Sequence, residues 1–292
     1  MKRIALALML SGTAMAQSVL NVATGSAEGT YSQMFKNLGA VCTSSSWLKE
    51  RKTSGSLDNI ELLLNNEVSM SFVQLDVLKA KQQIDKDPRA DEIRTLVPLH
   101  PEEVHVFTSK GFSGNTFESL APYTVGTIRK TTKLRNVGAW GGSVITAKVL
   151  SAMTGIKYNI VVVNDQKSAF AALQAGKLDA VIAVVGQPAA WVKSLPNSFK
   201  LLGFQNTVSL SKLYQPAKLF YSNLSLNSVN TVSIQSVLAT RNFKTAEKRN
   251  QLLSYQSCIS KKLPELQESE GMHAKWGQVN ITKFLWPKYT GK

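Results

Sequence analysis

Short apolar runs alternate with amphipathic runs along this chain, and this alternation constrains the fold more than any other feature. The apolar runs predict strands at residues 19–23, 70–73, 93–99, 104–108, 160–163, 180–185, 201–204 and 229–239. The amphipathic runs predict helices at residues 31–41, 57–65, 76–83, 144–153, 168–175 and 245–266. Strands that alternate with helices indicate an α/β fold in which helices flank mostly parallel sheets.

The chain has 292 residues, which is more than one hydrophobic core usually holds, and two lobes are therefore expected. Residues 110–119 are rich in Gly, Ser and Asn, as is typical of a connector. We place lobe 1 at residues 17–108 plus 206–292 and lobe 2 at residues 109–205. A lobe built from both ends of the chain requires two crossings, which together form a hinge.

The N-terminus has the three parts of an export signal. Lys2 and Arg3 are basic, residues 4–15 are mostly apolar, and Ala14-Met15-Ala16 fits a cleavage site. The apolar run is shorter than the ~20 residues that span a bilayer. We expect a signal peptide at residues 1–16 and a periplasmic mature protein, with a buried first helix as the alternative.

The chain contains two cysteines, Cys42 and Cys258. An even pair in an oxidising compartment predicts a disulfide, which here would join the first predicted helix to the last. Two buried free thiols are the alternative. The spacing Cys-x-x-Cys, which would indicate a zinc or redox site, does not occur.

The chain is strongly basic, with 34 Lys and Arg, 19 Asp and Glu and a net charge of +15. Loss of the signal peptide would leave 34 − 2 − 19 = +13, and residues 201–292 hold 12 basic and 4 acidic residues. Such a charge attracts anionic solutes or surfaces, although a solvated basic surface is the plainer interpretation. The basic residues are not interleaved with aromatic ones, so the sequence does not indicate a nucleic-acid partner.

Three predicted corners share one design, in which a turn rich in Gly, Ser or Thr precedes a helix. They lie at residues 25–31, 53–56 and 141–143. We expect Ser56 to cap the helix that follows it. A helix N-terminus has unpaired N–H groups and a partial positive charge, which attract carboxylate or phosphate. Three such corners on two lobes favour an anion-binding cleft.

Four stretches of the sequence resemble motifs of a known family. They are Ala23-Thr24-Gly25-Ser26-Ala27-Glu28-Gly29-Thr30-Tyr31, Thr53-Ser54-Gly55-Ser56-Leu57-Asp58-Asn59-Ile60, Phe72-Val73-Gln74-Leu75-Asp76-Val77 and Leu99-His100-Pro101-Glu102-Glu103-Val104-His105. Together they resemble the TAXI family of TRAP transporter solute receptors over nearly all of the mature chain. The resemblance implies a two-lobed, type II-like periplasmic binding protein with a ligand cleft between the lobes. The family's glycine motif in the second lobe is altered at residues 137–146, where one Gly is shifted or missing and Trp140 is inserted.

The resemblance also implies a function. It implies a monomeric receptor that captures a small anionic organic solute, either an amino acid such as glutamate or a dicarboxylate, and delivers it to a TRAP-type membrane transporter. A second hypothesis is a secreted basic protein whose cationic C-terminal region contacts a sensor, an envelope polymer or a host surface. Binding of that kind should weaken steeply with salt. No cofactor is expected, and the sequence leaves open whether a cation binds.

The positions that match the family's motifs give a predicted ligand site. Its donors come from Gly29, Thr30, Tyr31, Thr53, Ser54, Gly55, Ser56, Gly142 and Ser143. Gln74 and Asp76 would hold an ammonium or hydroxyl group, and Trp140 would stack on the ligand. Gly186 and Gln187 follow the apolar run at 180–185 and are also expected to face the cleft. Packing in the interior is the alternative for Tyr31, Gln74 and Trp140.

The sequence gives no sign of catalysis, because it has no Gly-x-Ser-x-Gly elbow, Walker loop or Gly-x-Gly-x-x-Gly motif. His100 and His105 flank two glutamates, but Pro101 prevents the helical spacing that a metal-binding His pair needs. Glu102 and Glu103 are adjacent and would point to opposite faces of a strand. We therefore expect neither an enzyme nor a metal site.

Overall fold

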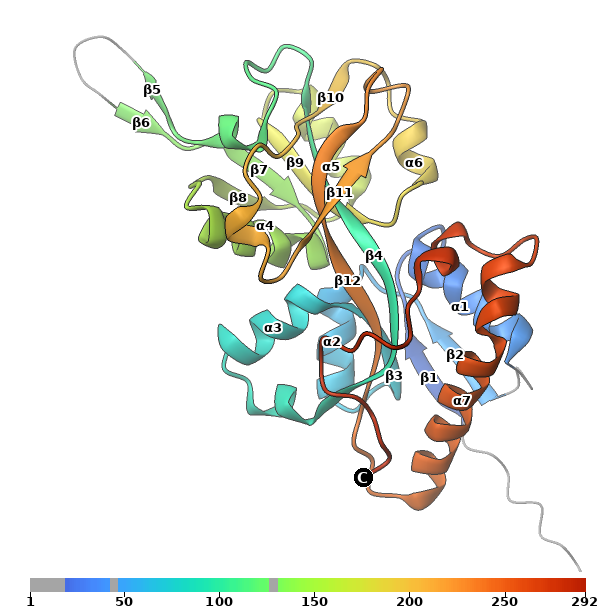
Figure 1. The fold of residues 1–292 in the computed structure, drawn as a ribbon. Helices are drawn as coiled ribbons and strands as arrows, with labels where there is room; N and C mark the ends of the chain where they lie inside the picture. The colour runs from blue at the N-terminus through green and yellow to red at the C-terminus, as the bar shows by residue number, and fades with distance from the viewer. Residues whose placement is uncertain (1–18, 43–46, 126–130) are drawn as a thin grey trace, which may run out of the picture.

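Two lobes, joined by two long strands that cross between them, make up the structure (Figure 1). The computed structural model describes residues 19–42, 47–125 and 131–292. The predicted signal peptide therefore lies outside the described residues. One mixed sheet runs through both lobes, and its strands follow one another in the order β2 (Leu48–Arg51), β1 (Leu20–Ala23), β3 (Met70–Gln74), β12 (Val229–Arg241), β4 (Ile93–Ser109), β9 (Ala180–Val185), β7 (Asn136–Ala139) and β8 (Asn159–Val162).

The lower lobe contains three parallel strands and the helices that cover them. These elements are β1 (Leu20–Ala23), α1 (Thr30–Val41), β2 (Leu48–Arg51), α2 (Ser56–Leu64), β3 (Met70–Gln74), α3 (Leu75–Gln83) and the 3-10 turn η2 (Pro88–Glu92). Every residue of β3 is buried. Phe72 packs in a cluster with Met34 of α1, whereas Val73 packs with Ile60 of α2. Both faces of the strand are therefore covered, which explains its continuous apolar sequence.

The upper lobe repeats this arrangement, with β7 between β8 and β9 in a parallel sheet. Its elements are η3 (Phe117–Leu120), β5 (Tyr123–Val125), β6 (Thr131–Lys133), β7 (Asn136–Ala139), α4 (Gly142–Thr154), β8 (Asn159–Val162), α5 (Gln166–Gln174), β9 (Ala180–Val185), α6 (Ala190–Lys193) and β10 (Phe199–Leu201). Strands β5 and β6 form a separate ribbon that projects from the lobe (Figure 1).

The crossing strands are β4 (Ile93–Ser109) and β12 (Val229–Arg241), which pair antiparallel to each other. The sequence predicted two strands in place of β4, and this was wrong because Pro101 lies within one continuous strand. Pro101 pairs with Gln235 beside a register shift in β12, and such an irregularity accommodates a residue without an N–H.

The return crossing lies in β12, later in the chain than the boundary expected at residue 205. The segment before it contains η4 (Val208–Leu210) and β11 (Gln215–Leu219). Leu219 packs in one cluster with Phe107 and Val181 of the upper lobe. Residues 206–228 were therefore assigned to the wrong lobe, because their polar sequence has no periodicity that indicates where they pack.

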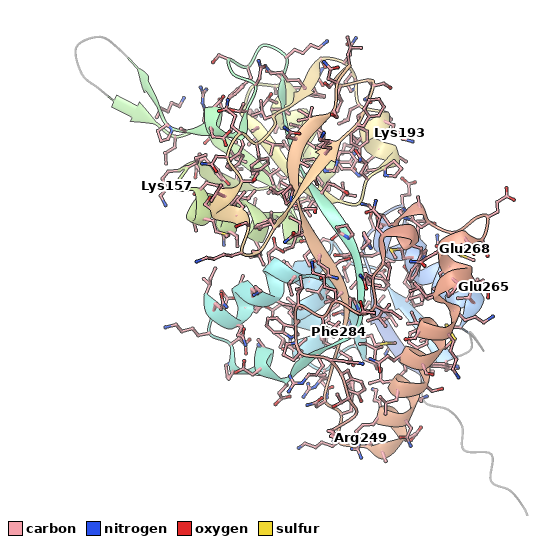
Figure 2. All side chains as sticks on the ribbon, in the orientation of Figure 1. Lys157, Lys193, Arg249, Glu265, Glu268 and Phe284 are labelled. Carbon is pink, nitrogen blue, oxygen red and sulfur yellow. A yellow bond between two sulfur atoms is a disulfide. The ribbon has the colours of Figure 1, made fainter. Side chains whose placement is uncertain are left out.

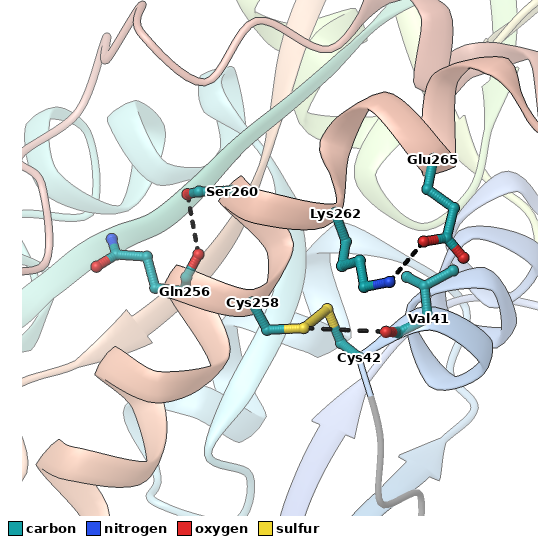
Figure 3. Close-up of a disulfide and its surroundings, with 7 residues drawn as sticks. All are labelled: Val41, Cys42, Gln256, Cys258, Ser260, Lys262 and Glu265. Carbon is teal, nitrogen blue, oxygen red and sulfur yellow. Dashed lines mark hydrogen bonds and ion pairs between the residues drawn. A yellow bond between two sulfur atoms is a disulfide. The ribbon is translucent and has the colours of Figure 1, made fainter.

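The C-terminal region returns to the lower lobe as α7 (Ala246–Glu268) and the short η5 (Ala274–Gln278). A disulfide between Cys42 at the end of α1 and Cys258 of α7 joins the N-terminal and C-terminal parts of the lower lobe (Figure 3). The predicted disulfide is confirmed. The last residues then lie against β4, where Tyr289 N–H donates to the Thr95 carbonyl at 2.9 Å.

Charged side chains are spread over both lobes. Lys157 and Lys193 lie on the upper lobe, whereas Arg249 lies at the lower end of α7 (Figure 2). Two C-terminal cations also make intramolecular contacts, because Arg249 donates to the Phe243 carbonyl and Lys288 lies over the Phe284 ring. Part of the basic excess therefore has a structural role.

Candidate ligand-binding site

Four helices begin where the two lobes meet, and none of them has a side-chain cap. The N-cap residues are Gly29 for α1, Gly55 for α2, Gln74 for α3 and Gly141 for α4. Side-chain oxygens usually satisfy some of the first N–H groups of a helix. The N-termini of α1, α2 and α4 therefore concentrate backbone donors and partial positive charge at one place, whereas in α3 Val77 N–H donates to Asp76 Oδ1 at 2.9 Å.

A cavity of about 170 Å³ lies at these helix starts. It is lined by Gly25, Ser26, Glu28, Gly29, Thr30, Tyr31, Ser54, Gly55, Ser56, Gln74, Glu102, Trp140, Gly142, Ser143, Gln166, Ala183, Val184, Val185 and Trp191. The volume exceeds that of one water several times over. An adjoining hollow shares Glu28, Trp140 and Gln166 with the cavity and continues past Asp165 and Lys167.

Buried hydrogen bonds fix the corner that precedes α2. The Asn59 amide donates to the carbonyls of Thr24 and Phe72, at 2.5 and 2.8 Å, and so attaches α2 to the ends of β1 and β3. The Thr53 hydroxyl lies within hydrogen-bond distance of the Thr24 carbonyl and accepts from Gly55 N–H at 3.0 Å. Gly55 has φ 121°, a conformation that favours glycine.

Tyr31 and Ser56 form the floor of the cavity together with Glu102. Tyr31 Oη donates to Glu102 Oε2 at 2.7 Å, and Ser56 Oγ lies 3.2 Å from Tyr31 Oη. Burial, and secondly the Glu102 charge, raises the pKa of Tyr31 well above its ordinary value, so the phenol stays protonated. Ser56 was expected to be an N-cap, but it is the first residue of α2, and its hydroxyl accepts from Gln74 N–H.

The start of α4 lies directly against the lower lobe. A Cβ at Gly142 would be 2.9 Å from the Ser56 Cβ and would overlap the Gln74 side chain, and one at Gly141 would overlap the Ser54 carbonyl. Only glycine allows the lobes to approach this closely. The structure is therefore a closed form of the two lobes.

The profile of the NMT1-like family matches residues 22–253, which is most of the chain. The chain belongs to the NMT1-like family. No curated protein matches the NMT1-like chain.

Several solved structures have the same fold. A protein called Tv2483, bound to L-arginine, has a TM-score of 0.55 at 11% identity, and 92% of this chain and 96% of that one are covered. A putative L-cystine ABC transporter protein of Listeria monocytogenes has a TM-score of 0.53 at 11% identity, with 89% and 96% covered. A periplasmic binding protein of an arginine transport system of Legionella pneumophila has a TM-score of 0.51 at 11% identity, with 85% and 95% covered. The predicted two-lobed α/β fold of periplasmic binding proteins is confirmed.

The NMT1-like structure brings ten of the predicted ligand-binding residues together around the cavity. These are Gly29, Thr30, Tyr31, Ser54, Gly55, Ser56, Gln74, Trp140, Gly142 and Ser143. Their contact with a ligand stays a prediction. The Ser143 hydroxyl also has a structural role, because it accepts from Val184 N–H at 3.0 Å and ties α4 to β9.

Four other predicted residues lie outside the cavity lining. Thr53 fixes the corner before α2 as described above. Asp76 is buried between the lobes, where it accepts from Thr146 Oγ1 at 2.6 Å and Tyr214 Oη at 2.9 Å. Gly186 packs on the Lys275 side chain, and Gln187 N–H donates to Glu103. These residues follow strands, as expected, but Thr53, Asp76 and Gln187 form hydrogen bonds with other groups of the protein.

The NMT1-like cavity also contains residues that the sequence did not single out as ligand-binding. They are Gly25, Ser26, Glu28, Glu102, Gln166, Ala183, Val184, Val185 and Trp191. Gly25, Ser26 and Glu28 belong to the first glycine-bearing corner, so that corner was the available signal for them. Glu102 was considered only as a metal ligand or a catalytic carboxylate, because the sequence does not show how β4 crosses between the lobes and brings this residue to the cavity.

His105, in the histidine-glutamate stretch of β4, contacts other protein groups. Within the described ranges, no three His, Cys, Asp or Glu side chains gather in a way that could hold a metal ion. His105 lies 2.9 Å from the Glu103 carbonyl and 3.1 Å from Tyr221 Oη. Burial lowers the pKa of His105 to about 4, so this ring is neutral near pH 7.

No described helix has the length and apolarity needed to cross a bilayer.

Proposed function

We propose that this NMT1-like protein is an extracytoplasmic solute-binding protein whose two lobes close around an amino acid. The observation that carries the proposal is the cavity between the lobes, at which four helices begin without a side-chain cap. A ligand that contacts both lobes favours the closed form, because it gains contacts there that the open form lacks.

The helix N-termini supply the recognition of one ligand group. Backbone N–H groups at a helix start bind carboxylates well, because the donors are oriented and the helix dipole is favourable. An α-carboxylate is therefore the group that we place against these amides. Among the structural neighbours, Tv2483 is bound to L-arginine and the Listeria protein is named for L-cystine, which supports an amino acid over the other small acids considered from the sequence.

Delivery to a membrane transporter is the second part of the proposal. The four motif stretches that resemble TAXI receptors favour a TRAP-type transporter. The neighbours described as ABC transporter proteins share only the fold, at 11 to 14% identity. The basic, apolar and small-residue segments at 1–16 favour export to the periplasm. In-cell crosslinking followed by mass spectrometry tests the partner, and an ABC permease among the products would replace the TRAP assignment.

Thermal unfolding of the mature chain tests the binding function. The chain is heated with each of the twenty standard amino acids, succinate or glutarate at millimolar concentration. A ligand present at 1,000 times its Kd stabilises the folded state by about 4 kcal/mol, which raises the melting temperature by several degrees. If no compound in the panel raises the melting temperature, the proposed function is wrong.

A further inference from the structure

Two adjacent glutamates in β4 differ in how their charges are balanced. Glu103 is neutralised within the protein, because Lys275 Nζ lies 2.6 Å from Glu103 Oε1 and Lys275 is fully buried. Gln187 N–H donates to the other oxygen of Glu103 at 2.7 Å. This carboxylate therefore has both a resident cation and a backbone donor.

Glu102 has no such cation. It is 4% exposed and lines the cavity. Its neighbours are the neutral Tyr31 hydroxyl and His100, whose Nε2 lies 3.7 Å from Glu102 Oε1 and carries charge only when protonated. Among the described residues that line the cavity there is neither lysine nor arginine. A buried carboxylate without a cation is costly, and a positively charged ligand would remove that cost.

A second acceptor lies in the same cavity. Gln74 Oε1 is buried and has no hydrogen-bond partner among the described residues. Such atoms are rare in folded proteins, because each one costs about 1–3 kcal/mol. The cavity thus contains two acceptors, on Glu102 and Gln74, in addition to the donors at the helix starts.

Aromatic rings and a further carboxylate complete this lining. Trp140 and Trp191 lie with ring centroids 6.3 Å apart, and both line the cavity. Indole faces attract cations. Glu28, which is exposed, lies at the junction of the cavity with the adjoining hollow.

We propose that Glu102 binds a positively charged nitrogen of the solute, and that this contact selects zwitterionic or cationic amino acids against dicarboxylates. The inference rests on the proposed function. The carboxylate of the solute lies at the helix starts, and its ammonium or guanidinium group lies at Glu102 and Gln74 Oε1. A dicarboxylate brings a second negative charge toward Glu102 and supplies no donor to either acceptor, so it is rejected.

Calorimetric titration of three chains tests the proposal: wild type, Glu102→Gln and Glu268→Gln. The matched control, Glu268, is an exposed glutamate at the end of α7 (Figure 2). The ligands are the twenty standard amino acids, succinate and glutarate, at pH 8. We expect Glu102→Gln to weaken the tightest amino acid at least tenfold and Glu268→Gln to change its affinity less than twofold.

A second measurement needs no variant and therefore does not depend on how Glu102→Gln folds. Wild type is titrated with analogues of its tightest amino acid that lack a positively charged nitrogen: the 2-hydroxy acid, which lacks the ammonium group, and, for a basic amino acid, also an analogue with an uncharged side chain. We expect at least a tenfold loss of affinity for one of these analogues. The proposal is overturned if every such analogue binds within twofold of the amino acid, or if succinate or glutarate binds more tightly than every amino acid. In either case the protein still binds a solute, so its function as a solute-binding protein stands, whereas tighter binding of a dicarboxylate would replace the amino acid as the proposed solute. Binding of no compound contradicts the proposed function itself.

Discussion

Replacement of Gly142 by alanine adds one methyl group where α4 of the upper lobe meets the lower lobe. The new Cβ would lie 2.9 Å from the Ser56 Cβ, which is too close for two carbon atoms, and would also overlap the Gln74 side chain. Gln74 has rotatable bonds and can move, whereas the Ser56 Cβ is fixed to the backbone of α2. Gly142 has no positive φ, so alanine suits the helix itself.

The size of the effect follows from this overlap. Extra methyl groups in a packed contact typically cost about 1–3 kcal/mol. The contact joins the two lobes, so the cost falls on the closed form and leaves the open form unchanged. A penalty of that size corresponds to a Kd that is about 5- to 150-fold weaker.

The assay is calorimetric titration with the tightest amino acid of the panel. The control is Gly39→Ala in α1, which adds the same methyl group where no atom lies within 4 Å and should leave the Kd unchanged. Both variants should unfold at or above the wild-type melting temperature without ligand. A Gly142→Ala Kd within twofold of wild type would refute the closure contact as described.

Three further predictions concern stability. Burial raises the pKa of Asp76 to about 6, above the ~3.9 of an unfolded chain, so the folded state favours the protonated acid. The contribution of Asp76 to the free energy of unfolding is fully present below pH 4, and about 3 kcal/mol of it is lost as the pH rises through 6. Urea unfolding of Asp76→Asn should lack this pH dependence. An equal pH dependence in the variant would contradict the assignment. Removing the disulfide by Cys42→Ser and Cys258→Ser, which lie 216 residues apart, should lower the free energy of unfolding by about 5 kcal/mol; denaturant unfolding measures this, and a loss below about 1 kcal/mol would refute the estimate. Lys275→Met should lower the free energy of unfolding by about 3–5 kcal/mol, because Glu103 then stays buried and unpaired. Thermal unfolding should show that adding Glu103→Gln recovers part of this loss. No recovery would contradict the pairing of Lys275 with Glu103.

Local sequence signals were enough to predict most helices and strands. The helix predicted at 31–41 begins one residue earlier, at Thr30, and the strand predicted at 180–185 has those bounds in the structure. Apolar periodicity and glycine corners act over a few residues and are visible in the sequence. The crossing of β12 was misplaced because pairing between distant strands has no such local signal.

Side-chain roles were harder to predict than backbone corners. Thr53 and Asp76 lie at the expected corners, yet their polar atoms bond to Thr24, Thr146 and other protein groups. Glu102 was not predicted to bind a ligand, yet it lines the cavity. The alternation of side chains along a strand shows only that Glu102 and Glu103 point to opposite faces. Which of the two receives Lys275 depends on η5, about 170 residues further along the chain.

The central claim is that the two lobes close on a solute that carries both a carboxylate and a positively charged nitrogen. Mass spectrometry of the small molecules released by denaturing the freshly purified mature protein tests this claim most directly. We predict about one equivalent of an amino acid. Recovery of one equivalent of a dicarboxylate, or of any compound without an amine or guanidine, would contradict the account.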